Sequence, residues 1–191
     1  MAIQQPVVSL HNQVALITGA GQGVGQGIAL AMADAGARIA VTGRTLEKLQ
    51  HTCDLIRERG AQAIAIQCNV MDDESLQHTV QEVVDHFGTI DILVNNAQEM
   101  CLGSLLDLSD EQLDNGWRSG PRATFKLMKL CYPHLKPGGC IVNLASTAAK
   151  RWDSSGYGGY AAVKDAIRAL TRAAACEWGP DGIRSNVILP L

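Results

Sequence analysis

The chain has 191 residues, a length typical of one domain, and 47% of them are hydrophobic, which is enough for one continuous core. The net charge is only -3 and like charges form no long run, which argues against nucleic acid or a membrane surface as a partner. The six cysteines are scattered, without a C-x-x-C pair or histidines at zinc spacing, so we expect reduced thiols and no metal site. The expected partner is a small molecule.

The N-terminal stretch MAIQQPVVSLHNQ has neither the basic start nor the apolar core of a secretion signal. No window of the sequence approaches the apolar length of a membrane span. We therefore expect a cytoplasmic location.

Short apolar runs rich in β-branched residues alternate with longer amphipathic stretches, a pattern typical of repeated βαβ units. The runs predict strands at residues 14–18, 38–42, 63–67, 90–95, 139–144 and 184–189, and helices at about 23–35, 45–59, 72–87, 109–135 and 158–178. The prediction is an α/β fold of the Rossmann type, with a doubly wound parallel sheet between two helix layers. We expect residues 1–191 to form a single domain.

A glycine-rich turn joins the first predicted strand to the first predicted helix, with the sequence TGAGQGVG at residues 18–25. Glycines allow the backbone to approach a pyrophosphate closely, and the helix N-terminus attracts the anion. The alternative is a purely structural turn, but the flanking strand and helix supply the context that the motif needs. The expected cofactor contacts here are Thr18, Gly19, Gln22, Gly23, Val24 and Gly25.

The end of the second predicted strand bears on the choice of dinucleotide. A carboxylate at this place binds the ribose 2′-hydroxyl of NAD(H), whereas a cation accepts the 2′-phosphate of NADP(H). This chain has Gly43 and then Arg44, whose guanidinium suits a phosphate. The sequence predicts a preference for NADP(H), leaving open NAD(H) as cofactor and a merely solvated Arg44.

Tyr160 and Lys164 lie four residues apart in the last predicted helix, so their side chains share one helix face. A phenol with a pKa of about 10 is a poor acid or base at neutral pH, and a nearby cation lowers that pKa. We expect Lys164 to act in this way on Tyr160, and we prefer Tyr160 to Tyr157 because Ala161 stands four residues after Tyr157. Ser146 directly follows the fifth predicted strand, where open α/β sheets bind ligands. It is therefore a candidate to hold a substrate carbonyl, the alternative being an ordinary loop hydroxyl.

These residues resemble the classical short-chain dehydrogenase/reductase family over essentially the whole chain. Five blocks match in order: the glycine turn, Asn69-Val70 where the family has Asp-Val beside the adenine, Asn95-Asn96-Ala97 after the fourth strand, Ser146, and Tyr160 with Lys164. The resemblance adds Asn69, Val70, Asn96 and Ala97, together with Tyr160 and Lys164, as expected cofactor contacts.

The resemblance also implies a mechanism with Ser146, Tyr160 and Lys164 as catalytic residues. Tyr160 would protonate a carbonyl oxygen as the nicotinamide delivers hydride, or the reverse for a secondary alcohol. Ser146 would hold the reacting oxygen, and Lys164 would lower the pKa of Tyr160 and bind the nicotinamide ribose. Relatives of this kind assemble through two of their helices, so the resemblance implies a homodimer or homotetramer.

Three features depart from the family pattern. Gln98 stands where the family has glycine, and Gly120 stands where the family has a catalytic asparagine on a helix. Pro121 is expected to interrupt that helix, because proline donates no backbone hydrogen bond. The sequence stops at Leu191, where the family continues into a substrate lid and a seventh strand, so we expect a C-terminally incomplete domain or a short form.

The leading hypothesis is an NADP(H)-dependent oxidoreductase acting on a ketone or secondary alcohol. The departures at Gln98 and Gly120, together with the early C-terminus, motivate an alternative, a catalytically weak dinucleotide-binding or scaffold protein of the same fold. A third reading, a subunit whose main role is assembly, follows from the alanine-rich stretch at residues 161–175, which core packing explains equally well.

Overall fold

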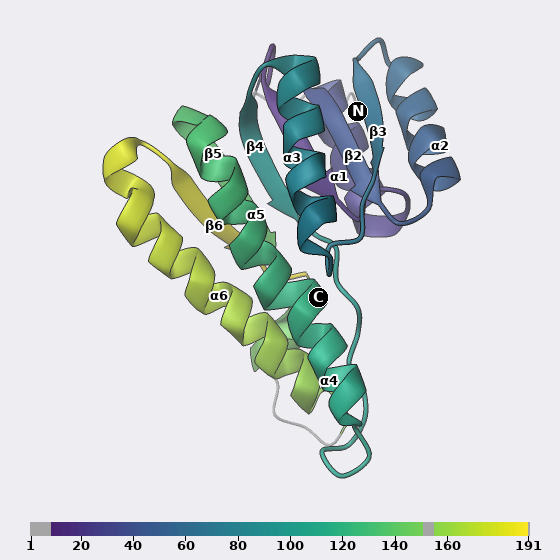
Figure 1. The fold of residues 1–191 in the computed structure, drawn as a ribbon, viewed down its shortest axis with the longest axis vertical. Coiled ribbons are helices and arrows are strands. Elements are labelled where there is room, and N and C mark those ends of the chain that lie inside the picture. Colours follow the sequence, from purple (N-terminus) through teal and green to yellow (C-terminus); the bar gives the residue numbers. More distant parts are fainter. Residues whose placement is uncertain (1–8, 151–154, 191) are drawn as a thin grey trace, which may run out of the picture.

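The computed structural model describes residues 9–150 and 155–190, and most of the N-terminal stretch MAIQQPVVSLHNQ lies outside them. Six parallel strands form one sheet in the order β3-β2-β1-β4-β5-β6 (Figure 1). The strands are β1 (Val14–Thr18), β2 (Arg38–Gly43), β3 (Ala63–Gln67), β4 (Ile90–Asn95), β5 (Leu135–Leu144) and β6 (Arg184–Ile188). The helices are α1 (Gly23–Asp34), α2 (Leu46–Arg57), α3 (Asp73–Phe87), α4 (Asp110–Trp117), α5 (Ala123–Cys131) and α6 (Gly158–Trp178). The predicted Rossmann-type fold is confirmed.

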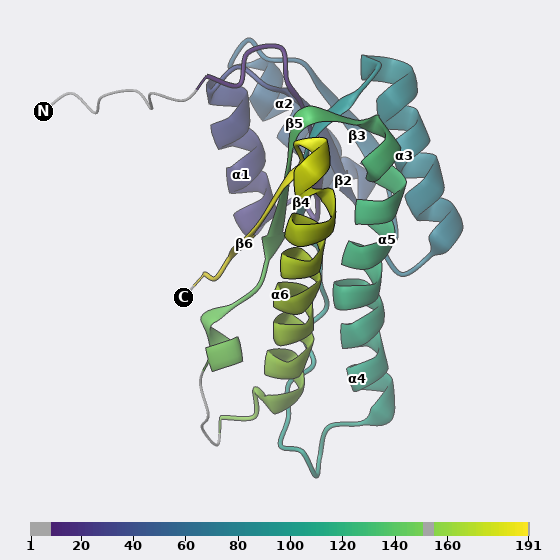
Figure 2. The ribbon, with the colours of Figure 1, turned by 90° about the vertical axis from the view of Figure 1, so that its left-hand side faces the viewer.

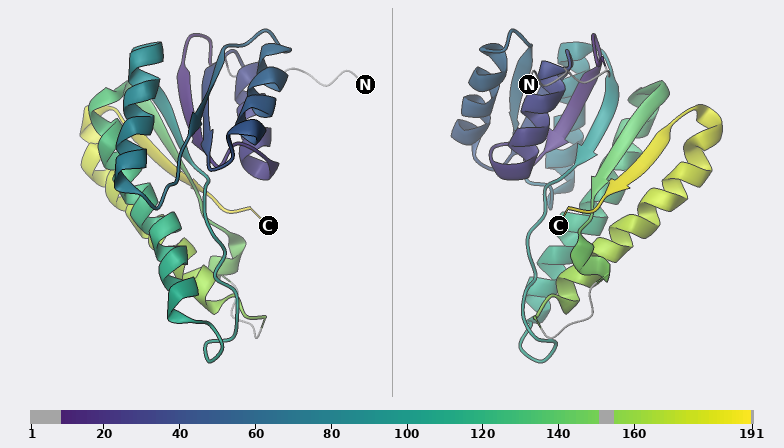
Figure 3. Two further views of the ribbon diagram at one scale, coloured as in Figure 1. Left: turned by 45° about the vertical axis from the view of Figure 1, so that its right-hand side comes forward. Right: turned by 180° about the vertical axis from the view of Figure 1, so that it is seen from behind.

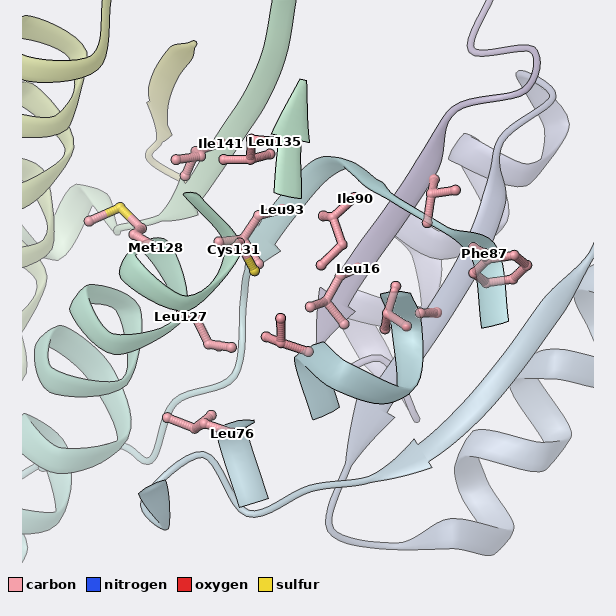
Figure 4. Packing of buried hydrophobic residues seen from close by; sticks show 14 of the residues in the cluster. Leu16, Leu76, Phe87, Ile90, Leu93, Leu127, Met128, Cys131, Leu135 and Ile141 are labelled. Carbon is pink, nitrogen blue, oxygen red and sulfur yellow. The ribbon is translucent and has the colours of Figure 1, made fainter. Parts of the chain in front are cut away.

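The central strand β1 is buried on both faces, and its alternating side chains divide the core into two halves. Val14 and Leu16 face α3, α5 and α6, whereas Ala15 and Ile17 face α1 and α2. Figure 2 shows α1 on one side of the strands and α3 and α5 on the other, and Figure 4 shows Leu16 among side chains of α3, β4 and α5. This three-layer packing fixes the strand ends where the expected site lies.

Interactions within a few residues of the chain set several helix ends. The carboxylate of Asp72 accepts a hydrogen bond from Ser75 N at 2.9 Å and caps the start of α3. Gly88 ends α3 in the left-handed conformation, with φ of 80°. Ser109 caps the start of α4 through a reciprocal pair of hydrogen bonds with Gln112.

The helix expected at residues 109–135 is divided, as Pro121 predicted. A π-helical turn (Arg118–Arg122) joins α4 to α5, and a short 3-10 turn (Tyr132–His134) follows α5. Because Pro121 has no N–H, the wider turn absorbs the missing hydrogen bond while the chain stays helical on both sides. The segment therefore keeps its direction, and α4 and α5 run beside α6 (Figure 3).

Strand β5 is longer than expected and begins at Leu135 instead of residue 139. Its pairing with β4 shifts register between Ile90 and Ile92, so the added part joins the sheet through an irregular stretch. Pro137 and Gly138 in that stretch are strand breakers, which is why the sequence pattern missed it. The neighbouring edge strand β6 stops at Ile188, one residue before its predicted end.

All six cysteines carry free thiols, and Cys53, Cys68, Cys101 and Cys131 are buried, as expected of core residues. Cys176 differs, because α6 leaves it exposed. Among the residues that the structure describes, no helix combines the length and the apolar character needed to cross a membrane.

Candidate functional site

The glycine turn between β1 and α1 requires glycine at several positions. Gly19 and Gly23 have φ of 66° and 59°, the left-handed region that other residues avoid. At Gly25 a Cβ atom would lie 2.4 Å from the carbonyl oxygen of Gly19, closer than any real contact. The turn is therefore a tight cradle of backbone at the N-terminus of α1, as an anion-binding turn requires.

Thr18 and Asn96 fasten this turn to the segment that follows β4. The Thr18 hydroxyl accepts hydrogen bonds from the backbone N–H groups of Asn96 and Ala97, both at 3.0 Å. In return, Asn96 Nδ2 donates to the carbonyl oxygens of Thr18 at 2.9 Å and Gly19 at 3.3 Å. Thr18 is 2% exposed and is not among the residues that line the cleft beside the turn, so its part there is to hold the two segments together.

A cleft of about 380 Å³ opens beside the turn, at the carboxyl ends of β1, β2 and β4. Its lining contains most of the cofactor contacts expected from the sequence: Gly19, Gln22, Gly23, Val24, Gly25, Arg44, Asn69, Val70, Asn96 and Ala97. The backbone cradle and the cations around it suit the phosphates of a dinucleotide.

Two charged residues of the cleft were not singled out in the sequence. Lys48 donates a hydrogen bond to Gln22 Oε1 at 2.6 Å, which brings a second cation close to the turn. Its position four residues after Arg44, across the start of α2, was a usable signal. Glu99 forms an ion pair with Arg44, with Nη1 and Oε1 2.6 Å apart. No local pattern announces that contact, because 55 residues separate its partners.

Ser146, Tyr160 and Lys164 come together at the carboxyl end of β5. The Ser146 side chain is hydrogen-bonded to Tyr160 and accepts a hydrogen bond from Ala148 N at 3.1 Å. The Lys164 ammonium lies 5.5 Å from the centre of the Tyr160 ring and donates to the carbonyl oxygen of Leu144 at 2.6 Å. The expected trio is thus one cluster, which stands outside the lining of the glycine cleft.

The pKa values in this cluster differ from the sequence expectation. Burial raises the pKa of Tyr160, with electrostatic contributions from Cys101 and Tyr157, while the hydrogen bond with Ser146 acts in the opposite direction. Burial also lowers the pKa of Lys164 from 10.5 to about 8, because Lys164 is only 3% exposed. The Lys164 ammonium lies over the ring of Tyr160, and the net shift in the pKa of the phenol is upward. The expected lowering of the Tyr160 pKa by Lys164 is therefore wrong for this structure.

Comparison with known proteins agrees with this geometry. A sequence profile described as short chain dehydrogenase matches residues 13–191. A 12alpha-hydroxysteroid dehydrogenase from Clostridium sp. is 42% identical over 94% of this chain and 72% of its own length. A hydroxynaphthalene reductase from Aspergillus fumigatus is 35% identical over 95% of this chain and 66% of its own length.

Solved structures give the same result. A short chain dehydrogenase from Burkholderia cenocepacia in complex with NADP has a TM-score of 0.91 at 36% identity, covering 95% of this chain and 74% of that one. A short-chain dehydrogenase/reductase from Serratia marcescens has a TM-score of 0.92 at 32% identity, with the same shares covered. The chain spans 66% to 74% of the length of these four proteins. From this agreement of sequence, fold and site, the chain belongs to the short-chain dehydrogenase family of oxidoreductases.

Proposed function

We propose that the chain binds a nicotinamide dinucleotide in the glycine cleft and exchanges hydride between that cofactor and a ketone or secondary alcohol. The observation that carries this proposal is the cluster of Ser146, Tyr160 and Lys164. The side chain of Ser146 is hydrogen-bonded to Tyr160, and the ammonium of Lys164 lies over the Tyr160 ring. Residues 1–191 act in this proposal as a single dinucleotide-binding domain.

The proposed cofactor is NADP(H) in preference to NAD(H). Arg44 and Lys48 place two cations at the cleft, and a structural relative was solved in complex with NADP. Glu99 works against this preference, because its carboxylate neutralises Arg44 and resembles the acid that binds a ribose 2′-hydroxyl. When bound, the cofactor would supply or accept the hydride.

The proposed proton donor for carbonyl reduction is Tyr160. A phenol whose pKa is raised stays protonated at neutral pH and can give its proton to a developing alkoxide. Ser146 would hold the reacting oxygen through its hydroxyl. Lys164 would keep the ring of Tyr160 in place and, together with Tyr160, bind the nicotinamide ribose, since an ammonium has three donors and Leu144 accepts one of them.

The proposed substrate is an apolar carbonyl or alcohol compound. The loop after β4 exposes three apolar side chains, Met100, Leu105 and Leu106. A hydrogen bond from Gly103 N to Gly156 O, at 2.9 Å, joins this loop to the segment just before α6, the helix that carries Tyr160. Two relatives are named for a hydroxysteroid and a hydroxynaphthalene, which supports a ring compound.

We also propose a homodimer or homotetramer in the cytoplasm. Trp117 and Phe125 are 41% and 42% exposed on the α4 to α5 segment, apolar surface of the kind that subunit contacts bury. Sedimentation that detects only monomer would end the assembly proposal.

The direct test combines turnover with binding. NADPH consumption is followed in the presence of a panel of ring ketones and aldehydes, and the shift in Tm caused by NADPH is measured in parallel. The proposal expects a clear rise in Tm and faster NADPH consumption with at least one carbonyl compound. A rise in Tm without turnover on any compound would favour a dinucleotide-binding or scaffold protein instead.

A further inference from the structure

Two departures from the family pattern meet in space, although 22 positions separate them in the sequence. Gln98 lies in the loop after β4, and Gly120 lies in the π-helical turn between α4 and α5. A Cβ atom at Gly120 would stand 2.9 Å from Gln98 Nε2 and 3.0 Å from Gln98 Cδ. The carboxamide of Gln98 thus fills the space that a side chain at position 120 would need.

The carboxamide of Gln98 is buried without hydrogen-bond partners. Both Nε2 and Oε1 are inaccessible to solvent, and neither atom has a partner in the structure. Burying an amide in this way is costly unless a bound molecule satisfies it. Gln98 also lines the glycine cleft, so a molecule bound in the cleft would lie close to Gln98.

The space beside Gly120 also adjoins the turn of α6 that carries Lys164. Val163 Cγ1 lies 2.9 Å from the hypothetical Cβ of Gly120, and Val163 directly precedes Lys164 in α6. The loop is fixed to the π-helical turn by Ser119, whose hydroxyl accepts from Glu99 N at 3.0 Å and donates to Asn115 O at 2.6 Å. Loop, π-helical turn and α6 therefore meet where the amide lies.

We propose that Gln98 and Gly120 act as one unit, in which the loop supplies the carboxamide that the family supplies from a helix asparagine. Gly120 has no side chain because the amide of Gln98 occupies its place. Gln98 is then a positioning residue for the α6 turn that bears Lys164. This inference rests on the proposed oxidoreductase function, and it replaces the expectation that activity is weakened by a missing asparagine.

The first test replaces the amide while keeping its volume. Gln98→Met preserves the length of the side chain but has neither a donor nor an acceptor. We expect the variant to keep its Tm within a few degrees and to keep the NADPH-induced Tm shift. We expect its kcat to fall about tenfold or more, because small misplacements of catalytic groups slow a reaction strongly. We also expect the alkaline limb of its profile of kcat against pH to move. Gln81→Met, on the exposed face of α3, is the matched control and should leave kcat unchanged.

The second test moves the carboxamide back to the helix. Gly120→Asn alone should lower Tm by about 3 °C or more, because the new side chain meets Gln98 and Val163. Gln98→Gly alone should lower kcat, and Gln98→Gly combined with Gly120→Asn should recover much of both losses. Losses that simply add in the double variant, or a Gln98→Met enzyme with wild-type kcat and pH profile, would overturn the proposal. Absence of turnover in the wild-type chain would refute the oxidoreductase function, while the four Tm values would still measure the coupling of the pair.

Discussion

Arg44 and Glu99 form an ion pair at the cleft, joining the end of β2 to the loop after β4 with 2.6 Å between Nη1 and Oε1. Both residues line the cleft that the proposal assigns to the dinucleotide. A 2′-phosphate would have to compete with the Glu99 carboxylate for the same guanidinium, and the carboxylate would repel it. The preference between the two dinucleotides therefore depends on this pair and not on Arg44 alone.

Removal of the Glu99 charge is expected to favour NADPH. In Glu99→Gln, Arg44 is free to pair with the phosphate, and we expect the Kd of NADPH to fall about threefold or more. The Kd of NADH should stay unchanged or rise, because the carboxylate is the group that suits a 2′-hydroxyl. Titration of both cofactors by calorimetry measures the two constants, and weaker NADPH binding in the variant would contradict this role of Glu99.

Removal of Arg44 is expected to have the opposite selectivity. Arg44→Ala should raise the Kd of NADPH about tenfold or more, since a charge-assisted hydrogen bond is lost, while NADH changes little. The ratio of the two Kd values, read in the same titrations, is its own control. An equal loss for both cofactors would refute the 2′-phosphate assignment.

Gly25 and Gly27 offer a matched pair within α1. Gly25→Ala should lower Tm by several degrees and weaken NADPH binding more than about tenfold, because the new Cβ would lie 2.4 Å from Gly19 O and open the turn. Gly27→Ala meets nothing within 4 Å, and its better helix propensity should raise Tm slightly. Thermal unfolding with and without NADPH measures both effects. Similar results for the two variants would show that the close approach at Gly25 is unimportant.

Lys164 is expected to cost stability at neutral pH. Burial lowers its pKa from 10.5 to about 8, which corresponds to a penalty on the order of 3 kcal/mol for the charged form. Lys164→Met removes the buried charge and loses the hydrogen bond to Leu144, worth about 1 kcal/mol. We expect Tm to rise by about 3 °C or more at pH 7 while turnover is lost.

The pH dependence gives the sign check for Lys164. The penalty is complete below the folded pKa of about 8, shrinks as the folded lysine loses its proton, and vanishes above the unfolded value of 10.5. The Tm gap between Lys164→Met and the wild type should therefore be largest below pH 8 and close as the pH rises. A variant that is less stable than the wild type at pH 7 would contradict a strained, buried ammonium.

Most of the fold could be predicted because its signals are local. The apolar runs, the capping Asp72 and the terminal Gly88 act within a few residues of the chain, and the structure keeps them. The first four residues of β5 could not be predicted, because Pro137 and Gly138 disfavour a strand that pairing with β4 nevertheless forms. Pro121 predicted an interruption of the helix but not that the interruption would be a π-helical turn.

The site was predictable in its motifs but not in its side-chain pairs. The glycine turn and the trio of Ser146, Tyr160 and Lys164 can be identified from order along the chain. The Arg44 to Glu99 pair and the contact of Gln98 with Gly120 depend on how loops from different strands meet, which no spacing encodes. The direction of the pKa shift of Tyr160 could not be predicted either, because the burial that raises this pKa arises only when the chain is folded.

The most direct test of the account is the turnover number of Tyr160→Phe beside that of Tyr157→Phe. The two tyrosine rings lie 6.1 Å apart, so the second variant controls for local packing, and only the first removes the proposed proton donor. We predict that Tyr160→Phe lowers the kcat of NADPH-dependent carbonyl reduction about a hundredfold or more with NADPH binding nearly intact, and that Tyr157→Phe keeps most of its kcat. Undiminished turnover in Tyr160→Phe would contradict the account.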